Sequence, residues 1–180
     1  MKKAAVLLAD GFEEIEAVTV IDILRRSGIA VQTVSVMGRM DVLGAHGIKV
    51  QADILFDNFD EGSDILILPG GGDGTANLGA HEGVCSLLTQ YNSSKKWIAA
   101  ICAAPTVLDA NGVLDGKEAV CYPSCEPILK NARVKQDAVC VCDNVITSRG
   151  PGTSAEFAFK IVELILDAKT ADSLKGQMLY

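Results

Sequence analysis

The hydrophobic pattern along the chain alternates between short, continuous apolar runs and longer segments with helical spacing. Continuous apolar runs are typical of strands buried on both faces of a parallel sheet. Such strands are predicted at residues 3–9, 29–37, 64–68 and 97–101. Apolar positions spaced three and four apart predict helices over residues 13–27, 82–91, 103–110 and 153–166.

Shorter features complete this pattern. Residues 42–44 and 48–50 suggest a small hairpin, and β-like pieces follow at residues 119–121, 138–142 and 144–148. In the first helix, the expected buried stripe consists of Ile15, Val18, Ile21 and Leu24. Gly28 is expected to end that helix.

Alternating strands and helices of these lengths predict βαβ units, and therefore an α/β fold whose mostly parallel sheet is covered on both faces. We find no linker, repeat or composition shift, so residues 1–180 are expected to form a single domain. Ligands of such sheets bind at the carboxyl ends of the strands. Three segments should reach that edge: residues 10–16, 69–74 and 102–105.

Cys102 follows the predicted strand at residues 97–101 and precedes a predicted helix. The segment Ala-Ile-Cys-Ala-Ala resembles a nucleophile elbow, in which small neighbours such as Ala100 and Ala104 allow a tight strand–turn–helix junction. Free N–H groups and the positive end of the helix predict that the thiol ionises more readily than a free cysteine. The alternative is an inert cysteine packed in the core.

Two neighbouring segments could supply the remaining groups of a catalytic site. The glycines at residues 70–72 would present bare N–H groups, which together with Ala103 could form an oxyanion hole, although an ordinary glycine-rich loop explains them equally well. Three acids, Glu13, Glu14 and Glu16, open the first helix. Glu16 precedes apolar residues and could point inward, where burial would raise its pKa, but the pattern alone does not select it from the three.

Charge and composition exclude several classes of function. The formal net charge is −7, and the Lys and Arg residues are scattered, so neither nucleic acid nor an anionic membrane is an expected partner. No apolar segment is long enough for a bilayer, and acidic residues interrupt the apolar start before a signal peptide is complete. We therefore expect a cytosolic protein.

Six cysteines in the cytosol should be free thiols rather than disulfides. Cys121, Cys125, Cys140 and Cys142 could be imagined as zinc ligands, but the last two lie in a β-like run, which favours thiols packed as small apolar groups. A nucleotide site is also disfavoured. Asp10, Glu13 and Glu14 occupy the place of a phosphate-binding glycine fingerprint, and the segment at residues 70–74 lacks the Lys and Ser or Thr of a P-loop.

Four blocks of sequence resemble the ThiJ/PfpI superfamily, and closely its branch of the parkinsonism-associated protein DJ-1 and its bacterial relatives. They are LADGFEEIE at residues 8–16, LPGG at 68–71, AAICAAPT at 99–106 and TSRGPGT at 147–153. The resemblance implies a flavodoxin-like α/β/α sandwich and a homodimer. It assigns the reactive thiol to Cys102, the partner carboxyl to Glu16, and the backbone donors to Gly71 and Ala103. It implies no cofactor and no metal.

This family includes proteins described as glyoxalases for methylglyoxal, as deglycases of early glycation adducts, and as oxidative-stress sensors or chaperones. The resemblance therefore implies either a cofactor-independent enzyme acting on a small carbonyl substrate or glycated protein, or a redox sensor whose Cys102 is oxidised to a sulfinate without turnover. Both need the same activated thiol.

The chain departs from the family pattern at one position. Many relatives carry a His near the thiol, where this chain has Tyr122, and the protease-like branch has a His where this chain has Ala103. The remaining histidines, His46 and His81, are expected at the surface, so a Cys–His protease is disfavoured. Arg149 could hold a carboxylate or phosphate, or could form an ordinary loop ion pair.

Overall fold

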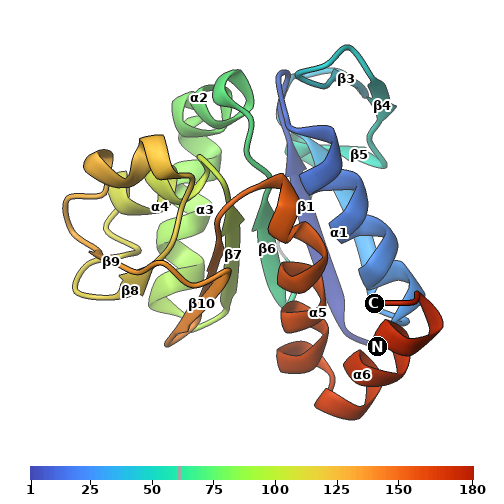
Figure 1. The fold of residues 1–180 in the computed structure, drawn as a ribbon. Coiled ribbons are helices and arrows are strands. Elements are labelled where there is room, and N and C mark those ends of the chain that lie inside the picture. Colours follow the sequence, from blue (N-terminus) through green and yellow to red (C-terminus); the bar gives the residue numbers. More distant parts are fainter. Residues whose placement is uncertain (61) are drawn as a thin grey trace.

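A seven-stranded sheet forms the centre of the molecule, and helices cover both of its faces (Figure 1). The structure is a computed structural model that describes residues 1–60 and 62–180. The strands of the central sheet are β1 (Lys3–Leu8), β2 (Ala30–Ser35), β5 (Ile54–Leu55), β6 (Ile65–Leu68), β7 (Trp97–Ile101), β10 (Val139–Cys142) and β11 (Val145–Ser148). Their order is β10-β11-β7-β6-β1-β2-β5, and only β10 runs antiparallel to its neighbour.

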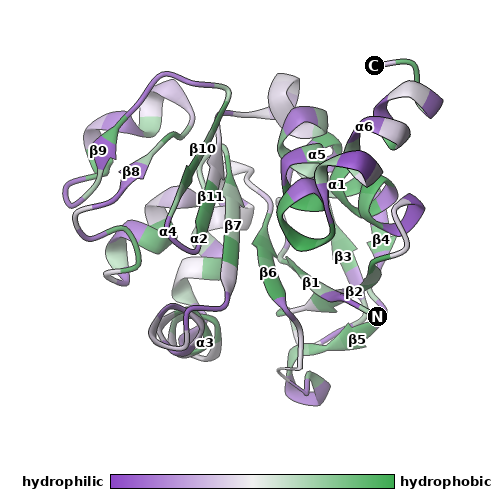
Figure 2. Cartoon of the chain, turned by 90° about the horizontal axis from the view of Figure 1, so that it is seen from below, coloured by the Kyte–Doolittle hydropathy of each residue, from purple (hydrophilic) through white to green (hydrophobic). Residues whose placement is uncertain are grey.

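The helices divide into two layers (Figure 1). One layer holds α1 (Glu14–Arg26), α5 (Ser154–Ile165) and α6 (Ala168–Gln177), and the other holds α2 (Gly72–Ala80), α3 (Glu82–Ser93) and α4 (Pro105–Ala110). Each layer packs on the sheet through its own cluster of buried apolar side chains. Figure 2 shows the apolar residues gathered on the strands and on the sheet-facing sides of α1 and α5. The predicted α/β/α sandwich is confirmed.

Small elements lie outside the central sheet. The predicted hairpin is confirmed as the antiparallel pair β3 (Asp41–Leu43) and β4 (Lys49–Gln51). A second pair, β8 (Glu118–Ala119) and β9 (Arg133–Val134), is parallel. Three short 3-10 helices occupy Phe56–Asn58, Pro123–Ile128 and Pro151–Thr153. Among the described residues, no helix combines the length and the apolar character needed to cross a bilayer.

The glycine-rich segment after β6 is helical, which the sequence analysis did not predict. Helix α2 begins at Gly72 and contains Gly74 and Gly79. A Cβ atom on Gly74 would lie 2.8 Å from the carbonyl oxygen of Gly11, so the helix backbone packs directly against the β1–α1 loop. Gly74 therefore permits a close approach of two backbone segments. Helix α6 was also not predicted.

The predicted buried stripe of the first helix is wrong in two positions. Ile15 is 54% exposed and Val18 is 47% exposed, whereas Ala17 and Val20 are fully buried. Apolar residues cover more than one side of this helix, so helical spacing alone fits two different faces. The face that packs inward also carries Glu16. This rotation of α1 brings an acid into the interior, beneath the carboxyl edge of the sheet.

The parallel register places three segments side by side at that edge. Leu68 of β6 pairs with Ala100 of β7, and Ser148 of β11 pairs with Ile101. Continuing both registers past the strand ends puts Gly70 on one side of Cys102 and Arg149 on the other, at an inter-strand spacing of about 4.8 Å. Cys102 is thus flanked by the predicted segment at residues 69–74 on one side and by the loop after β11, which was not predicted at this edge, on the other.

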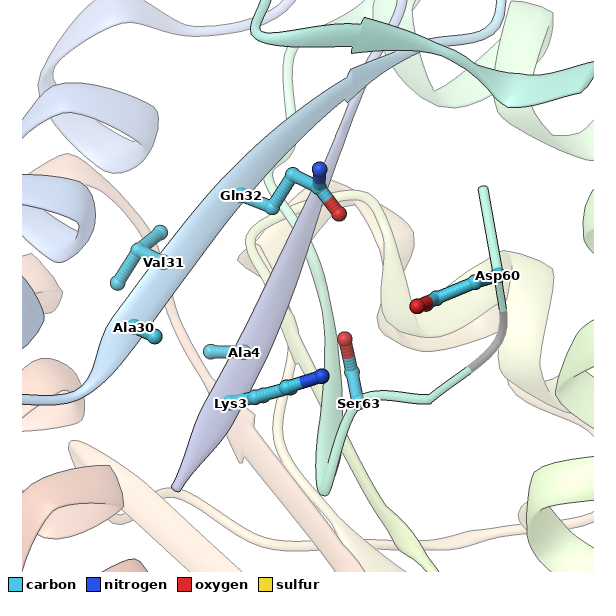
Figure 3. Close-up of a pocket in the computed structure, with 7 residues that line it drawn as sticks. All are labelled: Lys3, Ala4, Ala30, Val31, Gln32, Asp60 and Ser63. Carbon is cyan, nitrogen blue, oxygen red and sulfur yellow. The ribbon is translucent and has the colours of Figure 1, made fainter. Parts of the chain in front are cut away.

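A pocket of about 240 Å³ lies at the opposite end of the strands (Figure 3). It is formed at the amino ends of β1 and β2, between Lys3, Gln32 and Ser63. Because Cys102 follows the carboxyl end of β7, this pocket is remote from the elbow.

Candidate active site

The backbone at Cys102 adopts a strained conformation that its neighbours hold in place. Its φ angle is +65°, in the left-handed region that non-glycine residues rarely occupy. The Cys102 N–H donates to the carbonyl of Ser148 at 3.0 Å, and the Cys102 carbonyl accepts from the Tyr122 N–H at 2.8 Å. Hydrogen bonds on both sides of the residue therefore fix the turn. The predicted elbow is present, and Cys102 is 9% exposed.

Glu16 is fully buried and lies against the elbow. Its Oε2 accepts a hydrogen bond from the Gly70 N–H at 2.8 Å, and its carboxyl interacts with the Cys102 sulfur. Its Oε1 makes no hydrogen bond to a nitrogen or oxygen atom of the described residues. A buried carboxyl with one free oxygen beside a thiol is placed to exchange a proton with it.

Glu13 and Gly70 hold this carboxyl in position. The Glu13 side chain caps α1 by accepting from the Glu16 N–H at 2.8 Å, and the Glu13 N–H donates to the Gly70 carbonyl at 3.0 Å. The first turn of α1 is thereby fastened to the loop beside Cys102. Of the three acids that open the helix, only Glu16 faces the sulfur.

Gly70 has a role that the sequence analysis did not assign. A Cβ atom on Gly70 would lie 2.6 Å from Cys102 Cβ and 2.6 Å from Glu16 Oε2. No side chain fits there, so the contact between the thiol and the carboxyl requires a glycine. The Pro-Gly-Gly run indicated that glycines are needed here. The sequence alone did not show that Gly70 makes room for the thiol–carboxyl contact while Gly71 lies near the sulfur as a backbone donor.

The two predicted backbone donors, Gly71 and Ala103, lie near the Cys102 sulfur, and their N–H groups lower the pKa of its thiol. Gly71 has a φ angle of +91°, and a Cβ on it would lie 2.1 Å from the Gly11 carbonyl oxygen. A glycine is therefore required for both its conformation and its surroundings. The four predicted site residues come together in one place; their catalytic roles remain predictions.

The predicted low pKa of Cys102 is contradicted. Burial, followed by the charge and the hydrogen bond of Glu16, raises the pKa of the Cys102 thiol to about 12, against the N–H groups of Gly71 and Ala103, which lower it. Helix α4 has only six residues and begins at Pro105, so the positive helix end is weaker than expected. Desolvation and the neighbouring acid outweigh the two amides.

Burial also raises the pKa of Glu16, to about 7, against the opposing hydrogen bonds from Cys102 and Gly70, and with a smaller contribution from the charge of Glu13. The carboxyl and the thiol therefore titrate as a coupled pair, whose first proton leaves near neutrality. Above that pH the pair retains one proton. A thiolate forms when this proton moves from the sulfur to Glu16, because the carboxylate charge then disappears.

The residues around the pair match several expectations. Tyr122, in place of the histidine of many relatives, contributes its N–H to the elbow and packs its ring near Gly150. His46 is exposed and bonds to Glu14 at 2.7 Å, and His81 caps α3 through Nδ1. Neither histidine contacts the described thiol–carboxyl pair. Arg149 forms the expected loop ion pair, with Glu126 at 3.7 Å.

The six cysteines are free thiols, as predicted, and the four imagined zinc ligands do not form a metal-binding group within the described residues. Glu13, Glu14 and His46 do bring ligand atoms within 4.8 Å of one another. Both Glu14 oxygens already accept hydrogen bonds from His46, which joins the β3–β4 hairpin to α1. These contacts explain the group, and we assign no metal to it.

Comparison with known proteins agrees with this arrangement. The sequence model of the DJ-1/PfpI family matches residues 2–164. The chain is 42% identical to protein dj-1beta of Drosophila melanogaster, over 99% of this chain and 97% of that one. It is 36% identical to the glutathione-independent glyoxalase DJR-1.2 of Caenorhabditis elegans, over 96% and 94%.

The fold is equally similar to solved structures. Toxoplasma gondii DJ-1, in an oxidised form, superposes with a TM-score of 0.97 at 35% identity, covering 100% of this chain and 99% of that one. The superposition covers the whole chain and therefore every element that forms the elbow. The chain therefore belongs to the DJ-1/PfpI family, in its DJ-1 branch.

Proposed function

We propose that this protein is a cofactor-independent enzyme of the glyoxalase or deglycase type, acting on small dicarbonyls such as methylglyoxal and glyoxal or on early glycation adducts. The observation that carries the proposal is the contact between Cys102 and a buried Glu16 whose pKa lies near neutrality. A general base is most effective when its pKa is close to the working pH. The name of the C. elegans relative, a glutathione-independent glyoxalase, supports the same reaction class.

In the first step, the Cys102 sulfur attacks the aldehyde carbon while Glu16 takes the thiol proton. A carbon–sulfur bond forms, and the carbonyl electron pair moves to oxygen. The N–H groups of Gly71 and Ala103, which lie at the sulfur, can donate to this oxyanion. The product is a hemithioacetal, and Glu16 now carries the proton that the oxyanion needs.

In the second step, Glu16 transfers a proton between the two substrate carbons. The hydrogen on the former aldehyde carbon leaves as a proton, an enediol forms, and a proton returns to the neighbouring carbon. This gives a 2-hydroxy thioester without any external oxidant, because one carbon is oxidised as the other is reduced. Water then hydrolyses the thioester, releases the hydroxyacid and restores the thiol.

A direct test is to incubate the purified protein with methylglyoxal, without glutathione or metal, and to follow loss of the dicarbonyl together with formation of lactate. The proposal expects both to proceed at matching rates. Loss of methylglyoxal without lactate would indicate simple adduct formation on side chains and would contradict the enzymatic function.

A second candidate function, an oxidative-stress sensor, is favoured by the same pair of residues. Two equivalents of peroxide would convert the Cys102 thiol to a sulfinic acid with release of two waters, and a protonated Glu16 could donate to the sulfinate. The Toxoplasma relative has been solved in an oxidised form. Among the described residues, only Cys102 has both a buried acid and two amides at its sulfur.

We expect mild peroxide to add two oxygen atoms to Cys102 before it modifies Cys85, Cys125 or Cys142, which are partly exposed but have no such partners. Intact mass followed by peptide mapping measures this, with Cys102→Ser as the control. Oxygen spread evenly over the other cysteines would count against the sensor.

We also propose that two copies of the chain associate through the outer face of α1. Ile15 and Val18 on this helix, and Ile48 between the two hairpin strands, are large apolar side chains that are 54%, 47% and 57% exposed. The hairpin is joined to the start of α1 through Glu14, which accepts hydrogen bonds from His46 and from the Ile48 N–H, so Ile48 lies beside this helix.

Sedimentation velocity of the wild type should give a dimer, and Val18→Arg should shift it to a monomer while leaving the circular dichroism unchanged. Ser173→Arg, on the exposed part of α6, is the matched control. A monomeric wild type would contradict the proposal.

A further inference from the structure

The pocket of about 240 Å³ at the amino ends of β1 and β2 takes no part in the proposed reaction (Figure 3). Its apolar lining consists of Ala4, Ala30 and Val31. Four polar side chains complete the lining: Lys3 of β1, Gln32 of β2, and Asp60 and Ser63 from the segment before β6. An apolar wall with a few convergent polar groups is the usual composition of a site for a small molecule.

The Ser63 hydroxyl is the buried polar group of this pocket. Ser63 is 4% exposed, and its carbonyl accepts a hydrogen bond from the buried Tyr91 hydroxyl at 3.0 Å, which holds its backbone in place. Its own hydroxyl makes no hydrogen bond with any described residue, and Figure 3 shows it directed into the pocket. A buried hydroxyl without a partner is costly, so a molecule that bonds to it is favoured.

Two opposite charges face this hydroxyl without pairing. Figure 3 shows the side chains of Lys3 and Asp60 both turned toward Ser63. They form no ion pair with each other, and the Lys3 ammonium has no acidic partner within the described residues, whereas its neighbour Lys2 pairs with Asp64 at 3.3 Å. One Asp60 oxygen accepts the Gly62 N–H at 3.0 Å, and the other accepts nothing from the described residues. A positive and a negative charge are therefore both available to a molecule in the pocket.

The backbone around the pocket is already in place. The Lys3 N–H donates to the Asp64 carboxylate at 2.8 Å, and the Ala30 N–H donates to the Lys2 carbonyl at 2.9 Å. The parallel register between β1 and β2 fixes Gln32 opposite Ala5. The Gln32 amide, which can both donate and accept, has no hydrogen-bond partner among the described residues. Binding therefore needs only side chains to be ordered, which limits its entropic cost.

We propose that this pocket binds a small zwitterion of the α-amino acid class. The carboxylate of the ligand accepts hydrogen bonds from the Lys3 ammonium and the Ser63 hydroxyl. Its ammonium group donates to the Asp60 carboxylate and to the side-chain oxygen of Gln32. A short aliphatic side chain, such as that of valine, packs on the apolar lining. The inference is independent of the proposed function, because the pocket lies at the end of the sheet opposite to Cys102.

The test is a titration of isotope-labelled protein with L-valine, followed by the chemical shifts of the backbone amides. We expect saturable changes that cluster at residues 3, 4, 30–32, 60 and 63. Isovalerate lacks only the amine of valine, and isobutylamine lacks only the carboxylate. Each should bind about two- to fivefold more weakly than valine, as expected for the loss of one partly exposed ion pair. Equal binding of valine and isovalerate would overturn the zwitterion.

Variants of the lining residues give the matching result on the protein side. Lys3→Gln and Asp60→Asn, both at exposed positions, should each weaken valine binding about two- to fivefold. Ser63→Ala should weaken it about two- to tenfold through the loss of one hydrogen bond. Lys169→Gln is the control, because it removes a positive charge from exposed α6, outside the pocket. The absence of saturable shifts in the wild type, or unchanged binding in both Lys3→Gln and Asp60→Asn, would contradict the proposal.

Discussion

Cys102→Ser is expected to abolish turnover of methylglyoxal, with kcat/KM falling about 10³-fold or more. A serine hydroxyl keeps the size and position of the side chain, but its proton is far too weakly acidic for Glu16 to remove. The strained φ angle and the hydrogen bonds to Ser148 and Tyr122 involve only the backbone, so the variant should fold normally. Measurement of lactate formation under substrate saturation and below it gives kcat and KM separately.

The control for this variant is Cys142→Ser, which changes a partly exposed thiol on β10. It should leave kcat/KM within about twofold of the wild type, because the thiol lies outside the site. If Cys102→Ser retained full activity while Cys142→Ser did not, the elbow would not be the reactive centre.

The second large effect is expected for Glu16→Gln, which should lower kcat/KM about 10²–10⁴-fold. Glutamine can still accept the Gly70 N–H through its side-chain oxygen, so the contact at 2.8 Å can persist. It cannot take or return a proton. Both steps of the proposed reaction depend on that transfer, so the loss should appear mainly in kcat.

The pH dependence of kcat/KM gives a further prediction, in which the direction of the change can be checked. In the wild type, kcat/KM should fall as the pH drops below about 7, because Glu16 then holds a proton and cannot accept another from Cys102. Glu16→Gln should lose this inflection. Glu156→Gln, an exposed acid in the first turn of α5, is the matched control and should keep it.

The position of the elbow could be predicted from sequence because it depends on local features. A buried strand followed by Cys102, with Ala100 and Ala104 two positions to either side, specifies a tight junction whatever the rest of the chain does. The alternation of strands and helices likewise specified the layers. The pattern alone could not identify Glu16 as the acid beside the thiol, because Glu13 and Glu14 fit the pattern equally well. The resemblance to a family identified it.

Features that depend on packing between distant segments escaped the sequence analysis. The rotation of α1, with Val20 inside and Val18 outside, follows from contacts with the sheet and α5 that apolar spacing does not encode. The glycine-rich start of α2 resembled a loop, because the sequence does not show that Gly74 packs closely against Gly11. Both elements bear on the site, because α1 carries Glu16 and Gly71 caps the start of α2.

The thiol pKa was misjudged for a related reason. The sequence indicated the donors of Gly71 and Ala103, which favour a thiolate, but not the depth at which the sulfur is buried or the carboxyl beside it. Both of these raise the pKa. The reactivity of the Cys102 thiol therefore depends on Cys102 and Glu16 together, and it could not be predicted from either residue alone.

The central claim is that the Cys102 proton passes to Glu16, and the rate of Cys102 alkylation by neutral iodoacetamide as a function of pH tests it most directly. The wild type should show an inflection near pH 7, where Glu16 loses its proton and can accept that of the thiol. In Glu16→Gln the inflection should move upward, above the ordinary range of cysteine, because burial remains and no base is left. An inflection that stays in place or moves downward in Glu16→Gln would show that the thiol ionises on its own and would contradict the account.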